Sequence, residues 1–198
     1  PDNPLVGGAT AADDPIIAYG LRNPFRMAAR PGTTEMWVGD VGWGEWEEVN
    51  RVGHTGDMPI ENFGWPCYEG IGKQGGYQGA GLSLCQSLYA ALGTVTDPHF
   101  TYKHSDKVVP DEACGTGSSA ITGIAFYGTG AYPTRYEGAL FFAHYARNCI
   151  WAMPLGPDGA PDPSQRLTFA SAASTPVDLK IGPEGDLFYV DINGGTIR

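Results

Sequence analysis

Residues 123–155 read GIAFYGTGAYPTRYEGALFFAHYARNCIWAMPL, and this stretch decides the fold class. It holds three short apolar runs separated by turns rich in Gly, Pro or polar residues, a pattern typical of antiparallel strands. Residues 27–52 and 178–198 repeat the order: strand, polar turn, apolar strand ending in a polar residue, short loop, strand. The polar residues that end the middle strands are Asp40, His144 and Asp191.

Such repeated units predict an all-β protein built as a β-propeller. A β-sandwich is the alternative, but it does not require units that resemble one another. We place blade-like units at residues 19–52, 121–155 and 177–198, with a Cys-bearing insertion at 53–118 and one helix-like run at 82–92. Because rings need at least about four blades, three units predict part of a propeller.

The composition narrows the class of partner. The chain has 198 residues, 42% hydrophobic and 17% charged, which indicates one globular domain or a large piece of one. A net charge of −10 argues against nucleic acid as a partner. No apolar run approaches the roughly 18 residues of a membrane span, so none is expected.

Four cysteines stand at positions 67, 85, 114 and 149, with no closely spaced pair of the kind that zinc prefers. We predict two disulfides and an oxidising compartment, extracellular or periplasmic. Three connectivities are possible, and free buried thiols are the alternative. We favour Cys67–Cys85 and Cys114–Cys149 because each pair closes a local loop.

The candidate ligand site lies within residues 19–50. Arg22 and Asn23 precede a turn at 39–48 that is rich in Gly and carboxylates. A planar guanidinium beside a carboxamide suits a ligand with carboxylate and carbonyl oxygens, and exposed main-chain carbonyls near carboxylates suit calcium. The alternatives are an arginine that ties loops together through backbone carbonyls and an acidic turn that is simply solvated.

Six motifs in this order resemble the glucose/sorbosone dehydrogenase family. They are YGLRNPFR at 19–26, GDVGWGEWEEVN at 39–50, NFGWPCYEG at 62–70, ITGIAFY at 121–127, ALFFAHYARNCIW at 139–151 and VDLKIGPEGDLFYVDINGGTIR at 177–198. The resemblance implies a soluble six-bladed propeller that oxidises sugars with pyrroloquinoline quinone (PQQ) and calcium. Residues 1–198 would then form the C-terminal half, about three blades.

The resemblance also implies roles for particular residues. It implies cofactor contacts at Arg22, Asn23, Trp43 and Arg147. It implies calcium ligands or near neighbours at Gly42, Trp43, Glu47 and Glu48, the first two through main-chain carbonyls. The general-base histidine of the family is expected outside this chain, and His144 is expected to cap a strand or line the channel.

Three positions depart from the family pattern. Thr175 and Val177 stand where an Arg-x-Arg pair is expected, and Ala146 stands where a lysine is expected, with Arg147 adjacent. Two hypotheses follow. The first is PQQ- and calcium-dependent oxidation of an aldose by hydride transfer, in partnership with the N-terminal half of the propeller or a second copy of the chain. The alternative is a non-catalytic extracellular propeller that binds carbohydrate or protein.

Overall fold

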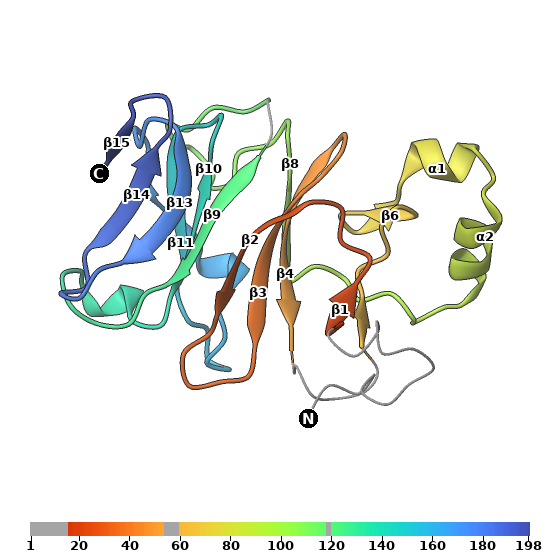
Figure 1. Ribbon diagram of the computed structural model, residues 1–198, viewed down its shortest axis with the longest axis horizontal. Coiled ribbons are helices and arrows are strands. Elements are labelled where there is room, and N and C mark those ends of the chain that lie inside the picture. The colour runs from red at the N-terminus through yellow and green to blue at the C-terminus, as the bar shows by residue number, and fades with distance from the viewer. Residues whose placement is uncertain (1–15, 54–59, 118–119) are drawn as a thin grey trace.

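The computed structural model describes residues 16–53, 60–117 and 120–198, and most of them belong to three antiparallel sheets (Figure 1). The first sheet contains β2 (Pro24–Ala29), β3 (Met36–Val41), β4 (Trp46–Val52) and β8 (Phe100–Lys103). The second contains β9 (Ile121–Phe126), β10 (Leu140–His144), β11 (Cys149–Met153) and β12 (Leu167–Ala170). The third contains β13 (Pro176–Ile181), β14 (Leu187–Asp191) and β15 (Thr196–Ile197).

The three sheets follow one another as propeller blades do. The first strands of successive sheets are neighbours, since β2 packs against β9 and β9 against β13. Strand order within each sheet is the order along the chain, from the inner strand outward. The predicted all-β fold and partial propeller are therefore confirmed.

The segment at 53–118 is more than an insertion. Its β8 pairs with β4 and gives the first blade its outer strand. Between these strands the chain forms a hairpin, two helices and a short strand that pairs with β1, which precedes β2, and this group of elements stands to one side of the blades (Figure 1). These elements are β1 (Ala18–Tyr19) parallel to β5 (Glu61–Asn62), the β6 (Tyr68–Glu69) and β7 (Gly72–Lys73) hairpin, α1 (Gly75–Gly79) and α2 (Ser83–Ala90).

Two apolar clusters hold the blades together. Trp37 and Phe142 belong to the cluster shared by the first and second blades, and Phe141 and Leu179 to the cluster shared by the second and third. Phe141 and Phe142 are adjacent in β10, and successive strand residues face opposite sides of a sheet. A strand with blades on both sides must therefore be apolar at every position, which explains the LFFA run.

In all three blades, the polar residue at the end of the middle strand accepts a hydrogen bond from the segment just before the first strand. Asp40 accepts hydrogen bonds from the main chain just before β2, and the Nε2 of His144 accepts one from Ala120, just before β9. Asp191 accepts one from the Thr175 hydroxyl, just before β13. The repeated polar position therefore secures the segment that leads into each blade.

Both favoured disulfides are present. Cys67–Cys85 ties the β6 hairpin to α2, and Cys114–Cys149 ties the segment after β8 to β11 of the second blade. The described residues contain no helix that is both long and apolar enough to span a bilayer. Two short 3₁₀ helices, Thr134–Tyr136 and Pro163–Gln165, complete the second blade.

Candidate functional site

The Arg22–Asn23 pair is held by a buried carboxylate. The backbone N–H groups of Arg22 and Asn23 donate to Asp40 at 2.9 and 2.6 Å, and the Asn23 carbonyl accepts from Val41 at 3.1 Å. Burial raises the pKa of Asp40 to about 6, against the lowering effect of these two hydrogen bonds. The backbone of the pair is thus fixed at the end of β3.

The guanidinium of Arg22 is anchored on one side only. Its Nη1 donates to the carbonyls of Val41 and Gly42 at 2.9 and 2.8 Å, and its Cζ lies 5.6 Å from the centre of the Trp65 ring. Both hydrogens of Nη1 are therefore engaged. The Nε–Nη2 edge donates to no group in the described part of the chain, and this edge matches a carboxylate in bidentate geometry. Arg22 consequently ties loops together and still offers an anion-binding edge.

Residues 42–46 form a tight loop with its amides turned toward one carboxylate. Glu69 of β6 accepts hydrogen bonds from the backbone N–H groups of all four residues 43–46, at 2.7 to 3.4 Å. Burial raises the pKa of Glu69, but these hydrogen bonds outweigh it and lower the pKa below 4.5. A Cβ added at Gly42 would lie 1.6 Å from the Trp46 carbonyl oxygen, so the loop requires glycine there. Sequence reasoning missed Glu69, and nothing in NFGWPCYEG pairs it with residues 43–46.

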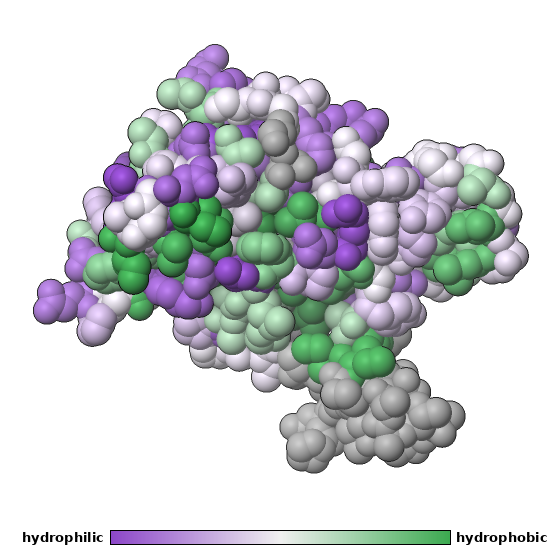
Figure 2. All heavy atoms as spheres, turned by 45° about the horizontal axis from the view of Figure 1, so that its top comes forward, coloured by the Kyte–Doolittle hydropathy of each residue, from purple (hydrophilic) through white to green (hydrophobic). Residues whose placement is uncertain are grey.

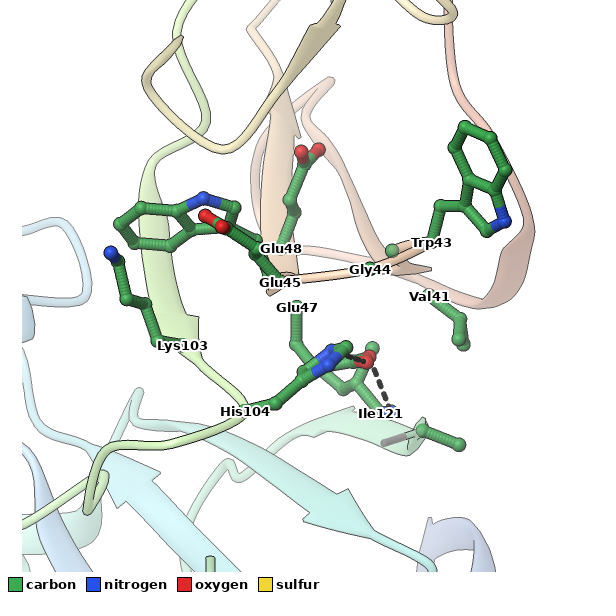
Figure 3. A network of polar contacts seen from close by, with 12 residues as sticks. Val41, Trp43, Gly44, Glu45, Glu47, Glu48, Lys103, His104 and Ile121 are labelled. Atoms are coloured by element: carbon green, nitrogen blue, oxygen red, sulfur yellow. Dashed lines mark hydrogen bonds and ion pairs between the residues drawn. The ribbon is translucent and has the colours of Figure 1, made fainter. Parts of the chain in front are cut away.

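Glu47 and Glu48 both form hydrogen bonds within the protein, and Figure 3 shows those of Glu47 with His104 and Ile121. Glu47, which is fully buried, accepts from the Ile121 N–H at 2.8 Å and contacts His104 Nε2 at 3.0 Å, so it joins the first blade to the second. Glu48 accepts from the Gly70 N–H at 2.7 Å and the Asn50 amide at 3.0 Å. Burial raises the pKa of Glu48 to about 7.

This geometry bears on the metal expected from the sequence. Each of the four oxygens of Glu47 and Glu48 already has one hydrogen-bond partner, which favours a structural role for both carboxylates, and their role as calcium ligands stays a prediction. Within the described ranges, no three His, Cys, Asp or Glu side chains gather as a metal site. The main-chain carbonyls of Gly42, which also accepts from Arg22, and of Trp43 are further candidate donors to a hard metal.

Trp43 and two other aromatic residues form a cluster beside Arg22. The ring centres of Trp43 and Trp65 are 5.9 Å apart, those of Trp43 and Tyr77 5.4 Å, and those of Trp65 and Tyr77 5.6 Å. Trp43 remains 51% exposed despite these contacts, and its ring points away from the Glu47–His104 pair (Figure 3). Asn23 is exposed as well. The structure thus brings Arg22, Asn23, Gly42 and Trp43 to one end of the first blade.

Arg147 lies elsewhere, on the second blade. Its guanidinium donates to the carbonyls of Lys103, His104 and Asp106 at 2.8 to 3.0 Å, and the residue is only 4% exposed. Arg147 and Ala146 do line a cavity of about 600 Å³. The contacts favour a structural role for Arg147, and a cofactor contact stays a prediction.

His144 and Thr175 also serve the blades. Burial and the nearby Arg147 charge lower the pKa of His144 to about 3, so its ring is neutral and accepts from Ala120 at 3.0 Å. This contact caps the start of β9, as expected, and leaves His144 unsuited to act as a general base. The hydroxyl of Thr175 is likewise engaged with Asp191 at 2.8 Å.

Successive antiparallel blades, each with its strands in chain order, define a β-propeller protein. The family model for "Glucose / Sorbosone dehydrogenase" matches residues 1–197, and the chain belongs to that family.

Relatives extend well beyond the length of this chain. It is 24% identical to the aldose sugar dehydrogenase YliI of Escherichia coli (strain K12) over 189 residues, which are 96% of this chain and 44% of that protein. It matches the PQQ-bound aldose sugar dehydrogenase of Streptomyces coelicolor with a TM-score of 0.61 and 21% identity, covering 100% of this chain and 46% of that one. It matches the apo aldose sugar dehydrogenase of Escherichia coli with a TM-score of 0.61 and 21% identity, covering 95% of this chain and 46% of that one. These structures support the fold, and the chain spans less than half the length of these relatives.

Proposed function

We propose that this chain supplies one wall of the cofactor pocket of a sugar dehydrogenase that oxidises an aldose with PQQ and calcium. The observation that carries the proposal is the Nε–Nη2 edge of Arg22, which donates to none of the described residues while two carbonyls hold Nη1. PQQ bears several carboxylates, and a fixed guanidinium edge is suited to bind one of them. Family membership and the PQQ-bound relative agree with this choice.

The chain's own residues would bind and orient the cofactor. Arg22 would hold a carboxylate, the Asn23 amide would donate to a carbonyl oxygen, and Trp43 would border the ring. Asp40 keeps the first two in place through their backbone N–H groups. When bound, PQQ supplies the hydride acceptor, and calcium polarises the accepting carbonyl as a Lewis acid.

Calcium would be held by the main-chain carbonyls of Gly42 and Trp43 together with oxygens of the cofactor. Glu47 and Glu48 would act on it only as nearby negative charge, because their oxygens are engaged in hydrogen bonds. The general base would come from the other half of the propeller, supplied by the N-terminal half or by a second copy. Two disulfides favour an extracellular or periplasmic location.

A second candidate is a non-catalytic propeller that binds carbohydrate or protein. Two residues at or near expected cofactor positions, on the second and third blades, instead form hydrogen bonds within the protein, which favours this candidate. Arg147 is committed to three carbonyls, and Thr175 is bound to Asp191 where the family has an arginine.

The deciding experiment is PQQ binding by the full-length protein in the presence of calcium, followed by sugar-dependent dye reduction. Arg22→Gln should weaken PQQ binding roughly 10- to 100-fold, the equivalent of a charge-assisted hydrogen bond. Arg135→Gln is the matched control, because Arg135 is an exposed arginine of the second blade. If the wild type binds no PQQ and reduces no dye with any aldose, the dehydrogenase proposal fails and the binding propeller remains.

A further inference from the structure

In the cluster of Trp43, Trp65 and Tyr77, packing alone does not explain why so large an apolar side chain as Trp43 stays half exposed. Three segments that are far apart in the sequence contribute to it: the β3–β4 loop, the segment before β6, and α1. Trp65 and Tyr77 pack against each other with an interplanar angle of 80° and so join α1 to the segment before β6. Trp43 adds contacts to both rings yet leaves about half of its surface in water, with 51% exposed.

All three rings are carried on fixed backbone. The amide of Trp43 donates to Glu69 at 2.7 Å, that of Trp65 to the Gly20 carbonyl at 2.8 Å, and that of Tyr77 to the Gln74 side chain at 2.9 Å. The Cys67–Cys85 disulfide closes the same region. Because the backbone that carries the rings is already fixed, little of the protein has to become ordered when a ligand binds, and the entropic cost of binding is small.

The chemistry of the surface selects the ligand. An indole that keeps half of its surface in water can receive a pyranose ring by the sugar's C–H face, through dispersion and the burial of apolar area. The Arg22 guanidinium, 5.6 Å from the Trp65 ring centre, adds hydrogen-bond donors at the edge for sugar hydroxyl oxygens.

We infer that Trp43, supported by Trp65 and Tyr77, is a stacking platform for the pyranose ring of an aldose. This deepens the proposed function, because it names the surface that receives the sugar. The platform is complete within this chain and needs neither PQQ nor the rest of the propeller.

The test is saturation-transfer NMR and calorimetry on the protein without PQQ or calcium, with D-glucose and with D-sorbitol. Sorbitol is the matched ligand, since it carries hydroxyl groups but no ring face. Glucose should bind with Kd of roughly millimolar order, with transfer strongest at the ring C–H protons, and sorbitol should not bind. Trp43→Ala should raise Kd at least about tenfold, and Trp43→Phe should stay within about threefold.

Phe188→Ala is the control variant, because Phe188 is an exposed aromatic residue (44%) on the third blade, and its Kd for glucose should equal that of the wild type. Near-ultraviolet circular dichroism verifies that each variant is folded. The inference is overturned if sorbitol binds as well as glucose, if folded Trp43→Ala binds glucose like the wild type, or if glucose does not bind. Glucose binding by a protein that binds no PQQ and reduces no dye with any aldose would sink the dehydrogenase proposal and leave the platform standing.

Discussion

Glu48 should make the stability of this protein fall as pH rises through the neutral range. The residue is 7% exposed, and burial raises its pKa from 4.5 to about 7, with the charges of Asp40 and Glu69 adding to the rise. A carboxyl with a raised pKa binds its proton more tightly in the folded than in the unfolded state. Its contribution is therefore intact below pH 4.5 and is lost between pH 4.5 and about 7. The loss amounts to roughly 3 kcal/mol of unfolding free energy.

Glu48→Gln removes this loss without removing the side chain. The glutamine oxygen can still accept from Gly70, and the Asn50 amide can rotate so that its Oδ1 accepts from the new N–H. In the wild type that Oδ1 is buried without a partner in the described part of the chain. Near pH 8 the variant should be more stable than the wild type by roughly 3 kcal/mol, and near pH 4.5 the two should be nearly equal.

Urea denaturation followed by tryptophan fluorescence, with the disulfides intact, measures both values. The buried His99 and His144 titrate in the opposite sense, since burial lowers their pKa values, but they are common to both proteins and cancel in the difference. Glu45→Gln, at an exposed position in the loop just before β4, should change stability by less than about 0.5 kcal/mol. A wild-type-to-variant difference that does not change between the two pH values would refute the reasoning.

Three other sets of substitutions test the loop, the arginine contacts and the disulfide that support the site. Gly42→Ala should destabilise the protein by about 3 kcal/mol or more in the same urea assay, whereas Gly44→Ala, where an added Cβ has open space, should cost no more than about 1 kcal/mol. Arg147→Ala should destabilise the protein by about 3 kcal/mol, seen as a lower melting temperature, because it removes the three hydrogen bonds from a buried guanidinium to main-chain carbonyls; a normally stable variant that loses only PQQ binding would instead make Arg147 a cofactor contact. Replacing Cys67 and Cys85 together by serine should cost about 3 kcal/mol through loop entropy, measured by thermal denaturation, and unchanged stability would count against the disulfide's role.

The fold was predictable because its signal is local and repeated. The apolar runs around Phe141, the polar residue that ends each middle strand, and the Gly- and Pro-rich turns each constrain a short segment. Repetition of the unit then specifies the ring. The outer strand β8 was missed because four residues, Phe100–Lys103, carry too little periodicity to stand apart from a long loop.

The site was harder because its geometry depends on partners distant in sequence. The sequence shows that Arg22 lies near a Gly-rich turn. It does not show that the Nη1 group alone donates to the carbonyls of Val41 and Gly42. It presents Glu47 and Glu69 as equivalent acidic residues. Only the fold shows that Glu47 joins two blades and that Glu69 gathers the amides of a loop 23 to 26 residues away.

The carboxylates of this region therefore act on the proposed site through the backbone. Asp40 fixes the amides of Arg22 and Asn23, and Glu69 fixes those of residues 43–46, so two anions orient the donors and carbonyls that a cofactor would meet. Such anchoring leaves main-chain carbonyls, instead of charged side chains, as the hard donors facing a ligand. A metal held mainly by carbonyls binds weakly without further anionic oxygen ligands. Calcium and a carboxylate-bearing cofactor should consequently bind this surface together, each strengthening the other.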